Sequence, residues 1–238
     1  MSLETLLHLF VGPHLIAGTV ALVLFWVAAV LVKGSPLHRR VGQGYLLAML
    51  AIILTAIPLV ILIWMRGHPI TAMFLGYLTL LIALTCRNAL AAIRFRRDPA
   101  RFAGLDLQLL GAVTGLAGMV VVITGLTRQA WILVAFGMIG PLILFQLARQ
   151  ARARRRGQAL ASNWWLKEHY GAMIANGVAT HIAFFQIGLM RLLPGLETAL
   201  VQQMAWFGPL IIALAVGRWL DRRYGQWPQP SQTRPGTW

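Results

Sequence analysis

Apolar residues in this chain are gathered into seven long runs, which short polar or basic segments separate. Each run has roughly 20 residues, the length that an α-helix needs to cross about 30 Å of hydrocarbon at 1.5 Å per residue. A membrane β-barrel would show shorter segments of alternating residues instead. The pattern therefore predicts an all-α, polytopic integral membrane bundle of seven transmembrane helices. The predicted spans cover residues 9–32, 43–65, 70–93, 104–126, 130–148, 169–191 and 199–220.

Short loops between the runs leave no room for a separate soluble domain. We therefore expect residues 1–224 to form a single transmembrane domain. The tail, residues 225–238, is rich in proline and glutamine and is predicted to be disordered. The N-terminus, Met1-Ser2-Leu3-Glu4, lacks the basic segment that opens a signal peptide. The first apolar run is therefore expected to be retained as a helix.

Composition agrees with the membrane interpretation. Hydrophobic residues make up 58% of the chain and charged residues only 11%, whereas a soluble domain carries about 25% charged residues. The net charge of +15 would fit a nucleic-acid-binding protein. The basic residues, however, lie in short loops between apolar runs, as in membrane proteins that follow the positive-inside rule. This placement argues against nucleic acid and leaves the lipid bilayer as the expected surroundings.

The basic residues also predict an orientation. The loops after spans one, three, five and seven, together with the C-terminal end, hold 17 of the 21 lysines and arginines. Only Arg66, Arg128 and Arg191 lie in the loops on the other side. Because basic loops stay in the cytoplasm, the N-terminus is predicted outside and the C-terminus in the cytoplasm. The expected location is the inner (plasma) membrane of a bacterium.

Four histidines in or beside the spans fall into two groups by depth. His14 and His181 are expected toward the outer side of the membrane, and His38 and His169 near the cytoplasmic side. Imidazole binds haem iron, copper and zinc. The two groups therefore predict one or two b-type haems, or another metal, held by histidine pairs. The competing interpretation of His14 is a structural hydrogen bond to a backbone carbonyl of the next helix.

A polar stripe follows one face of the sixth predicted span. His169, Met173, Asn176 and Thr180 are spaced four, three and four residues apart, which places them on one side of a helix. Asparagine and threonine commonly form hydrogen bonds between helices in membrane bundles. We therefore expect the stripe to pack against a neighbouring helix.

Arg87 lies inside the third predicted span, about two turns from its cytoplasmic end. Its side chain either extends to the membrane surface or faces the bundle interior. In the interior it would bind an anion, such as a haem propionate, a quinone head group or a lipid phosphate. Asp106, on the same side of the membrane, is its expected partner within the chain.

Glycines and prolines predict local packing. Gly111, Gly115 and Gly118 lie on the fourth span at the spacing that lets two helices pack closely. Pro58, Pro141 and Pro209 fall inside three spans. Each removes a backbone hydrogen bond, and we expect each to be able to kink its helix.

The segment 33–42, Lys-Gly-Ser-Pro-Leu-His-Arg-Arg-Val-Gly, joins the first two spans. Gly34 permits a tight turn, and Ser35 followed by proline suits the start of a helix. His38 is then expected at the membrane boundary, as a ligand, a pH-sensitive lipid contact or a proton entry point. Together with His14-x-x-x-Gly18, this segment resembles a widespread bacterial family of small multi-pass membrane proteins, catalogued as a domain of unknown function.

The resemblance extends to the histidine of the last long apolar block, His169 or His181, and implies a multi-pass membrane fold but no reaction. The histidine distribution favours a membrane redox protein that passes electrons between a quinol, or another donor, and an acceptor. The alternative is a non-catalytic subunit or assembly factor of a larger membrane complex, because the loops are short and clear catalytic groups are missing. A transporter or channel is less favoured because the sequence has no evident inverted repeat.

Overall fold

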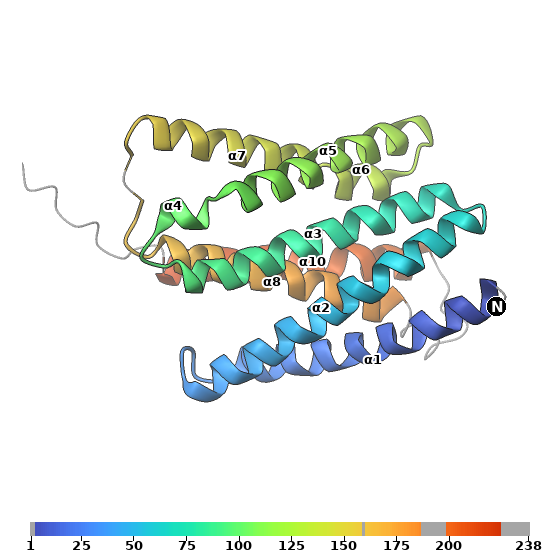
Figure 1. The fold of residues 1–238 in the computed structure, drawn as a ribbon, viewed down its shortest axis with the longest axis horizontal. Coiled ribbons are helices and arrows are strands. Elements are labelled where there is room, and N and C mark those ends of the chain that lie inside the picture. The colour runs from blue at the N-terminus through green and yellow to red at the C-terminus, as the bar shows by residue number, and fades with distance from the viewer. Residues whose placement is uncertain (1–2, 159, 187–198, 225–238) are drawn as a thin grey trace, which may run out of the picture.

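The computed structural model describes residues 3–158, 160–186 and 199–224, and the regular structure in these ranges is helical (Figure 1). The predicted tail disorder at residues 225–238 lies outside the described residues. The helices are α1 (Leu3–Val30), α2 (Pro36–Met65), α3 (Pro69–Arg94), α4 (Pro99–Phe102), α5 (Leu105–Thr127), α6 (Trp131–Gly137), α7 (Ile139–Arg155), α8 (Trp164–Phe184) and α10 (Ala199–Tyr224).

Among the described residues, six segments are long and apolar enough to cross a membrane, which confirms a multi-pass helical membrane protein. They cover Leu3–Val30, Pro36–Met65, Pro69–Arg94, Pro99–Thr127, Trp131–Arg155 and Val201–Tyr224. The sixth predicted span, 169–191, corresponds to α8, which is not among the six, and residues 187–191 lie outside the described residues. The 21 residues of α8 would extend about 32 Å, so its length suffices to cross the hydrocarbon.

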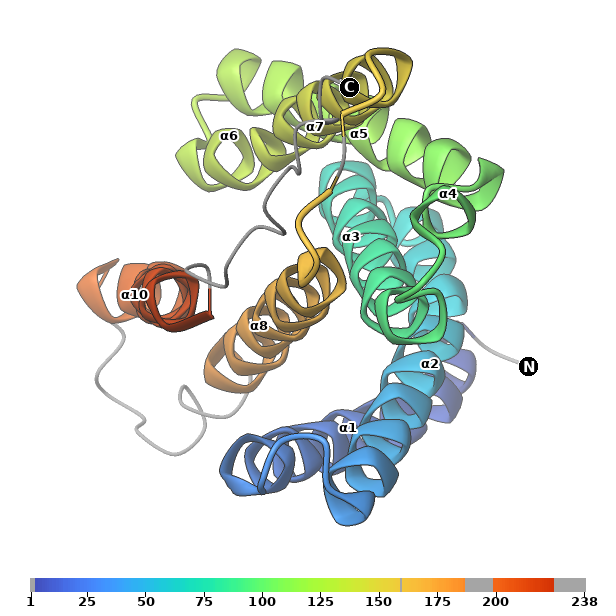
Figure 2. The same ribbon diagram turned by 90° about the vertical axis from the view of Figure 1, so that its left-hand side faces the viewer.

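Helices α3 and α8 pack against each other near the middle of the bundle (Figure 2). The α1–α2 hairpin lies on one side, where α2 contacts α3 and α1 contacts α8. On the other side, α5 packs against α3 and also against α6 and α7. Helix α10 packs on α8. Helix α8 therefore has neighbours on several sides, where its polar groups find partners instead of lipid.

The turn between α1 and α2 confirms the predicted helix start. Lys33 Nζ donates a hydrogen bond to the Ala28 carbonyl at 2.9 Å and so caps the end of α1. Gly34 has a φ of +79°, a conformation that glycine adopts without steric cost. The Ser35 hydroxyl accepts the backbone N–H of His38 at 3.1 Å, and α2 begins with proline at its first position.

Glycines bring α5 and α7 into backbone contact, as the spacing of Gly115 and Gly118 predicts. A Cβ built on Gly118 would lie 2.6 Å from the Gly140 Cα, and one on Gly140 would lie 2.7 Å from the Gly115 carbonyl oxygen. No side chain separates the two helices at this crossing. The small residues of α5 therefore serve helix packing.

The fifth predicted span, residues 130–148, corresponds to the membrane-spanning segment Trp131–Arg155 and is broken where α6 ends at Gly137 and α7 begins at Ile139. Pro141 explains the break. It has no N–H to donate to the Gly137 carbonyl four residues earlier, and its ring crowds that carbonyl. Pro58 and Pro209, in contrast, lie inside α2 and α10 without a break.

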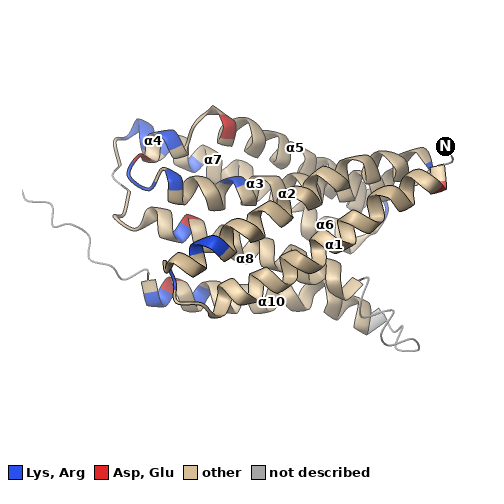
Figure 3. Cartoon of the chain, turned by 60° about the horizontal axis from the view of Figure 1, so that its bottom comes forward, with Lys and Arg blue, Asp and Glu red and all other residues tan. Residues whose placement is uncertain are grey.

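Lysines and arginines gather at one end of the bundle (Figure 3). We call this the basic end. It comprises the α1–α2 turn, α4 and the C-terminal ends of α3, α7 and α10. At the opposite end, the Arg66 guanidinium and the Glu4 carboxylate form an ion pair at 2.8 Å between α1 and the end of α2. The bundle therefore has two chemically different ends.

Candidate functional site

His38 lies in the first turn of α2 at the basic end. Its Nδ1 is 3.2 Å from the carbonyl oxygen of Ala28 in α1. A carbonyl oxygen only accepts hydrogen bonds, so a neutral His38 must carry its proton on Nδ1 and donate it there. The Nε2 atom then keeps its lone pair.

His169 repeats this arrangement on another helix. It lies in the second turn of α8, and its Nδ1 is 3.0 Å from the carbonyl oxygen of Ala89 in α3. The same reasoning places the proton on Nδ1 and a lone pair on Nε2. Two histidines, from α2 and α8, are thus fixed in orientation by carbonyls of α1 and α3.

The His38 and His169 imidazoles are close enough to interact electrostatically, and both side chains are half-buried. Within the described ranges, neither Nε2 takes part in a hydrogen bond. An imidazole whose Nδ1–H is bonded to a carbonyl, with Nε2 free, is oriented as protein ligands of metals usually are. We call His38 and His169 the inner histidine pair.

A glycine leaves open space beside His38. Gly42 lies one turn after His38 and so on the same helix face. A Cβ built on Gly42 would meet no atom within 4 Å other than its local backbone. Ligand groups can therefore approach α2 next to His38.

A polar cluster lies in the interior along the same helix faces. Asn176, two turns after His169, has no exposed surface, and its Oδ1 accepts a hydrogen bond from the Thr85 hydroxyl of α3 at 2.6 Å. The Cys86 thiol lies 3.7 Å from the same oxygen. The prediction that the α8 stripe forms hydrogen bonds between helices is confirmed. The Asn176 amide nitrogen has no partner among the described residues.

Tyr45 is a member of this cluster that sequence reasoning missed. It lies seven residues after His38 on α2, is fully buried, and places its hydroxyl beside Thr180 of α8. Seven residues are about two helical turns, so Tyr45 and His38 share a face. This spacing was the signal that could have found it. The α2 face of His38 and Tyr45 is thus opposite the α8 face of His169 and Asn176.

His14 is held by a different neighbour. Its Nδ1 lies 2.9 Å from the hydroxyl oxygen of Thr55 in α2. The Thr55 hydroxyl lies 2.7 Å from the Ala51 carbonyl, which takes its only proton. His14 Nδ1 must therefore donate to Thr55. The Thr55 hydroxyl and the Ile52 backbone, both of the next helix, therefore hold His14, in line with the structural hydrogen bond considered from the sequence.

His181 has both ring nitrogens engaged. Its Nδ1 lies 2.7 Å from the Gly177 carbonyl, and its Nε2 accepts the indole N–H of Trp26 at 3.0 Å. Because the indole only donates, the Nε2 lone pair is already used. Trp26 is twelve residues, about 18 Å along α1, from His14. The structure therefore does not bring His14 and His181 together.

Arg87 makes the predicted pair with Asp106. Its Nε and Nη2 atoms donate to the two carboxylate oxygens at 2.8 and 2.9 Å, and Nη2 also donates to the Phe102 carbonyl at 2.6 Å. The guanidinium stacks over the Phe102 ring with 5.1 Å between Cζ and the ring centroid. These contacts join α3 to α4 and α5, and they occupy the Nε and Nη2 atoms of Arg87.

The described residues offer no larger metal site, since no group of three or more histidine, cysteine, aspartate or glutamate side chains is placed to bind an ion. No protein-family model, no curated protein and no solved structure matches this chain.

Proposed function

We propose that this protein is a membrane redox protein that holds one b-type haem, or another metal, through His38 and His169 at the basic end and transfers electrons. One observation carries this proposal. Two imidazoles from different helices interact electrostatically at the basic end, and each has Nδ1 bonded to a backbone carbonyl and Nε2 without a partner among the described residues. The other two candidates, His14 and His181, support no second site.

The chemistry of the donor set favours haem over a bare metal ion. A structural zinc ion usually takes four protein ligands, and a catalytic one takes three. Two imidazoles would be enough to hold haem, because the porphyrin would supply the other nitrogen ligands of the iron. The open space at Gly42, one turn after His38 on the same helix face, gives a planar group access beside His38.

The chain's own groups would then have defined roles. The Ala28 and Ala89 carbonyls accept the Nδ1–H bonds, fix the two rings and make each Nε2 a stronger donor to a metal. Haem, when bound, supplies one-electron chemistry. The buried side chains of Tyr45 and Asn176 keep hydrogen-bonding groups in the interior two turns from the pair.

The proposal includes seven spans, with α8 as the sixth, and a cytoplasmic basic end in a bacterial inner membrane. The gathering of lysines and arginines at that end supports this orientation. The resemblance of the segment 33–42 to the bacterial family is consistent with it. A quinol in the bilayer is the proposed electron donor, and the acceptor would meet the basic end.

The test is the reduced-minus-oxidised visible spectrum of the full chain, purified after expression in haem-replete cells. Wild-type protein should show a Soret band and about one haem per chain. His38→Ala and His169→Ala should each lose most of the bound haem, since each removes one of two ligands. A wild-type protein without haem or bound metal would refute the proposal and favour the role of a non-catalytic subunit or assembly factor.

Matched controls are available in the same chain. His8 and His68 are exposed at the opposite end, so His8→Ala and His68→Ala should keep the haem. His14→Ala and His181→Ala should also keep it, because these residues have other partners. Equal haem loss in all six variants would point to general instability instead of ligation.

A further inference from the structure

One exposed stripe of α7 changes from apolar to basic along the helix. Its members are three or four residues apart and so lie on one helix face. Met138, Leu142 and Phe145 form the apolar part, and all three side chains are exposed. The basic part follows directly and consists of Arg149, Arg152 and Arg156.

The three arginines of the stripe have no hydrogen-bonded partner for their guanidinium groups among the described residues. Arg154, on another face of the same helix, donates to the Ala103 carbonyl at 3.1 Å and so serves packing. Glu168 of α8 is an acidic neighbour that interacts electrostatically with Arg149. The stripe therefore keeps an excess of positive charge available to an outside anion.

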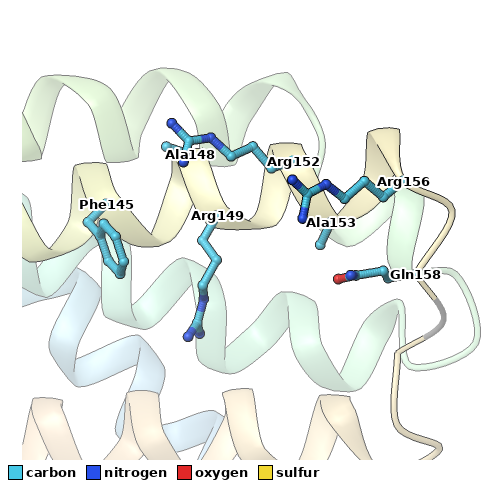
Figure 4. Close-up of a pocket in the computed structure, with 7 residues that line it drawn as sticks. All are labelled: Phe145, Ala148, Arg149, Arg152, Ala153, Arg156 and Gln158. Carbon is cyan, nitrogen blue, oxygen red and sulfur yellow. The ribbon is translucent and has the colours of Figure 1, made fainter.

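These arginines border an open groove of about 260 Å³ (Figure 4). Arg152 and Arg156 extend back along α7 over Ala148 and Ala153, whose small side chains leave the space. The Phe145 ring closes the end of the groove that is nearer the membrane centre. The groove is thus lined by guanidinium groups and, at the Phe145 end, by an apolar side chain.

We propose that this groove binds the headgroup phosphate of an anionic phospholipid, whose acyl chains lie along Phe145, Leu142 and Met138. Guanidinium groups bind phosphate through charge-assisted and often bidentate hydrogen bonds. The groove lies near the end of the candidate span Trp131–Arg155, where basic pockets meet lipid headgroups. A soluble phosphate or a nucleic acid would make no use of the exposed apolar residues. The proposal is independent of haem.

The experiment uses the purified full chain in a neutral detergent. Phosphatidylglycerol is titrated while thermal unfolding is followed by tryptophan fluorescence. Phosphatidylglycerol should raise the melting temperature, whereas phosphatidylcholine and inorganic phosphate at the same concentrations should not. Native mass spectrometry of the unmodified chain should show one retained phosphatidylglycerol. An equal effect of inorganic phosphate would overturn the lipid assignment and leave an anion site.

The stripe variant is Arg149→Gln/Arg152→Gln/Arg156→Gln. It should bind phosphatidylglycerol about 100-fold more weakly, because three basic contacts are lost. The control variant, Arg96→Gln/Arg97→Gln/Arg155→Gln, removes the same charge from exposed positions outside the stripe.

The control variant should retain most of the binding of phosphatidylglycerol. Unchanged binding in the stripe variant would contradict the proposal. Equal loss in both variants would also contradict it, since general attraction to positive charge would then explain the effect. If the stripe variant does not fold, absence of retained phosphatidylglycerol on the wild-type chain in native mass spectrometry still overturns the proposal.

Discussion

Gly118→Ala should destabilise the bundle through the crossing of α5 and α7. The new Cβ would lie 2.6 Å from the Gly140 Cα and 2.9 Å from the Gly137 carbonyl oxygen. Ordinary contacts between carbon atoms are about 3.5–4.0 Å, so the helices must separate by roughly 1 Å. Both neighbours are backbone atoms, which cannot rotate away. Overpacking of this kind costs about 1–3 kcal/mol, more than the gain of about 1 kcal/mol from replacing a helical glycine by alanine.

The measurement is the free energy of unfolding in mixed detergent micelles, followed by tryptophan fluorescence. Gly217→Ala in α10 is the matched control, because its Cβ would meet no atom within 4 Å. The control should be neutral or slightly stabilising. Gly140→Ala should match Gly118→Ala, and the double variant should cost less than the sum because one separation relieves both contacts. A Gly118→Ala protein as stable as the control would refute the close packing of α5 and α7.

Three further predictions concern single side chains, each measured by the same unfolding assay with wild type as reference. Ser35→Ala should destabilise by about 1 kcal/mol because the N-cap of α2 is lost, and unchanged stability would contradict the capping role. Asp106→Asn should lower the free energy of unfolding by at most about 1 kcal/mol, since the Asp106 carboxylate is largely exposed and screened by solvent. Arg87→Gln should cost more than Asp106→Asn, because Arg87 also bonds the Phe102 carbonyl, and the reverse order would contradict this assignment.

Two kinds of feature could be predicted from the sequence. One is structure within a single helix or turn, and the other is pairing of opposite charges that lie at the same depth in the membrane. Apolar run length predicts the spans, and the turn at Gly34 and Ser35 follows from local chemistry. The Arg87–Asp106 pair was predictable because a buried arginine needs an anion at its own depth, and few are present. Gly115 and Gly118 predicted a close crossing but not that α7, through Gly140, would be the partner.

Pairing of the histidines depended on information that the sequence does not contain. Depth alone placed His14 with His181, but the tilt of the helices brings Trp26 to His181 and Thr55 to His14. A helix rotated by one residue turns its side chains by 100°, so small differences in packing decide which groups meet. The break between α6 and α7 could not be predicted from a proline alone. Pro58 and Pro209 lie within unbroken helices, whereas Pro141 follows a break.

The central claim is that two imidazoles, those of His38 and His169, hold one haem or metal. The most direct measurement is the low-temperature electron paramagnetic resonance spectrum of the oxidised, purified full chain. A low-spin ferric signal typical of two imidazole ligands, lost in both His38→Ala and His169→Ala, is the predicted result. A high-spin signal, a signal unchanged in either variant, or no metal signal at all would contradict the claim.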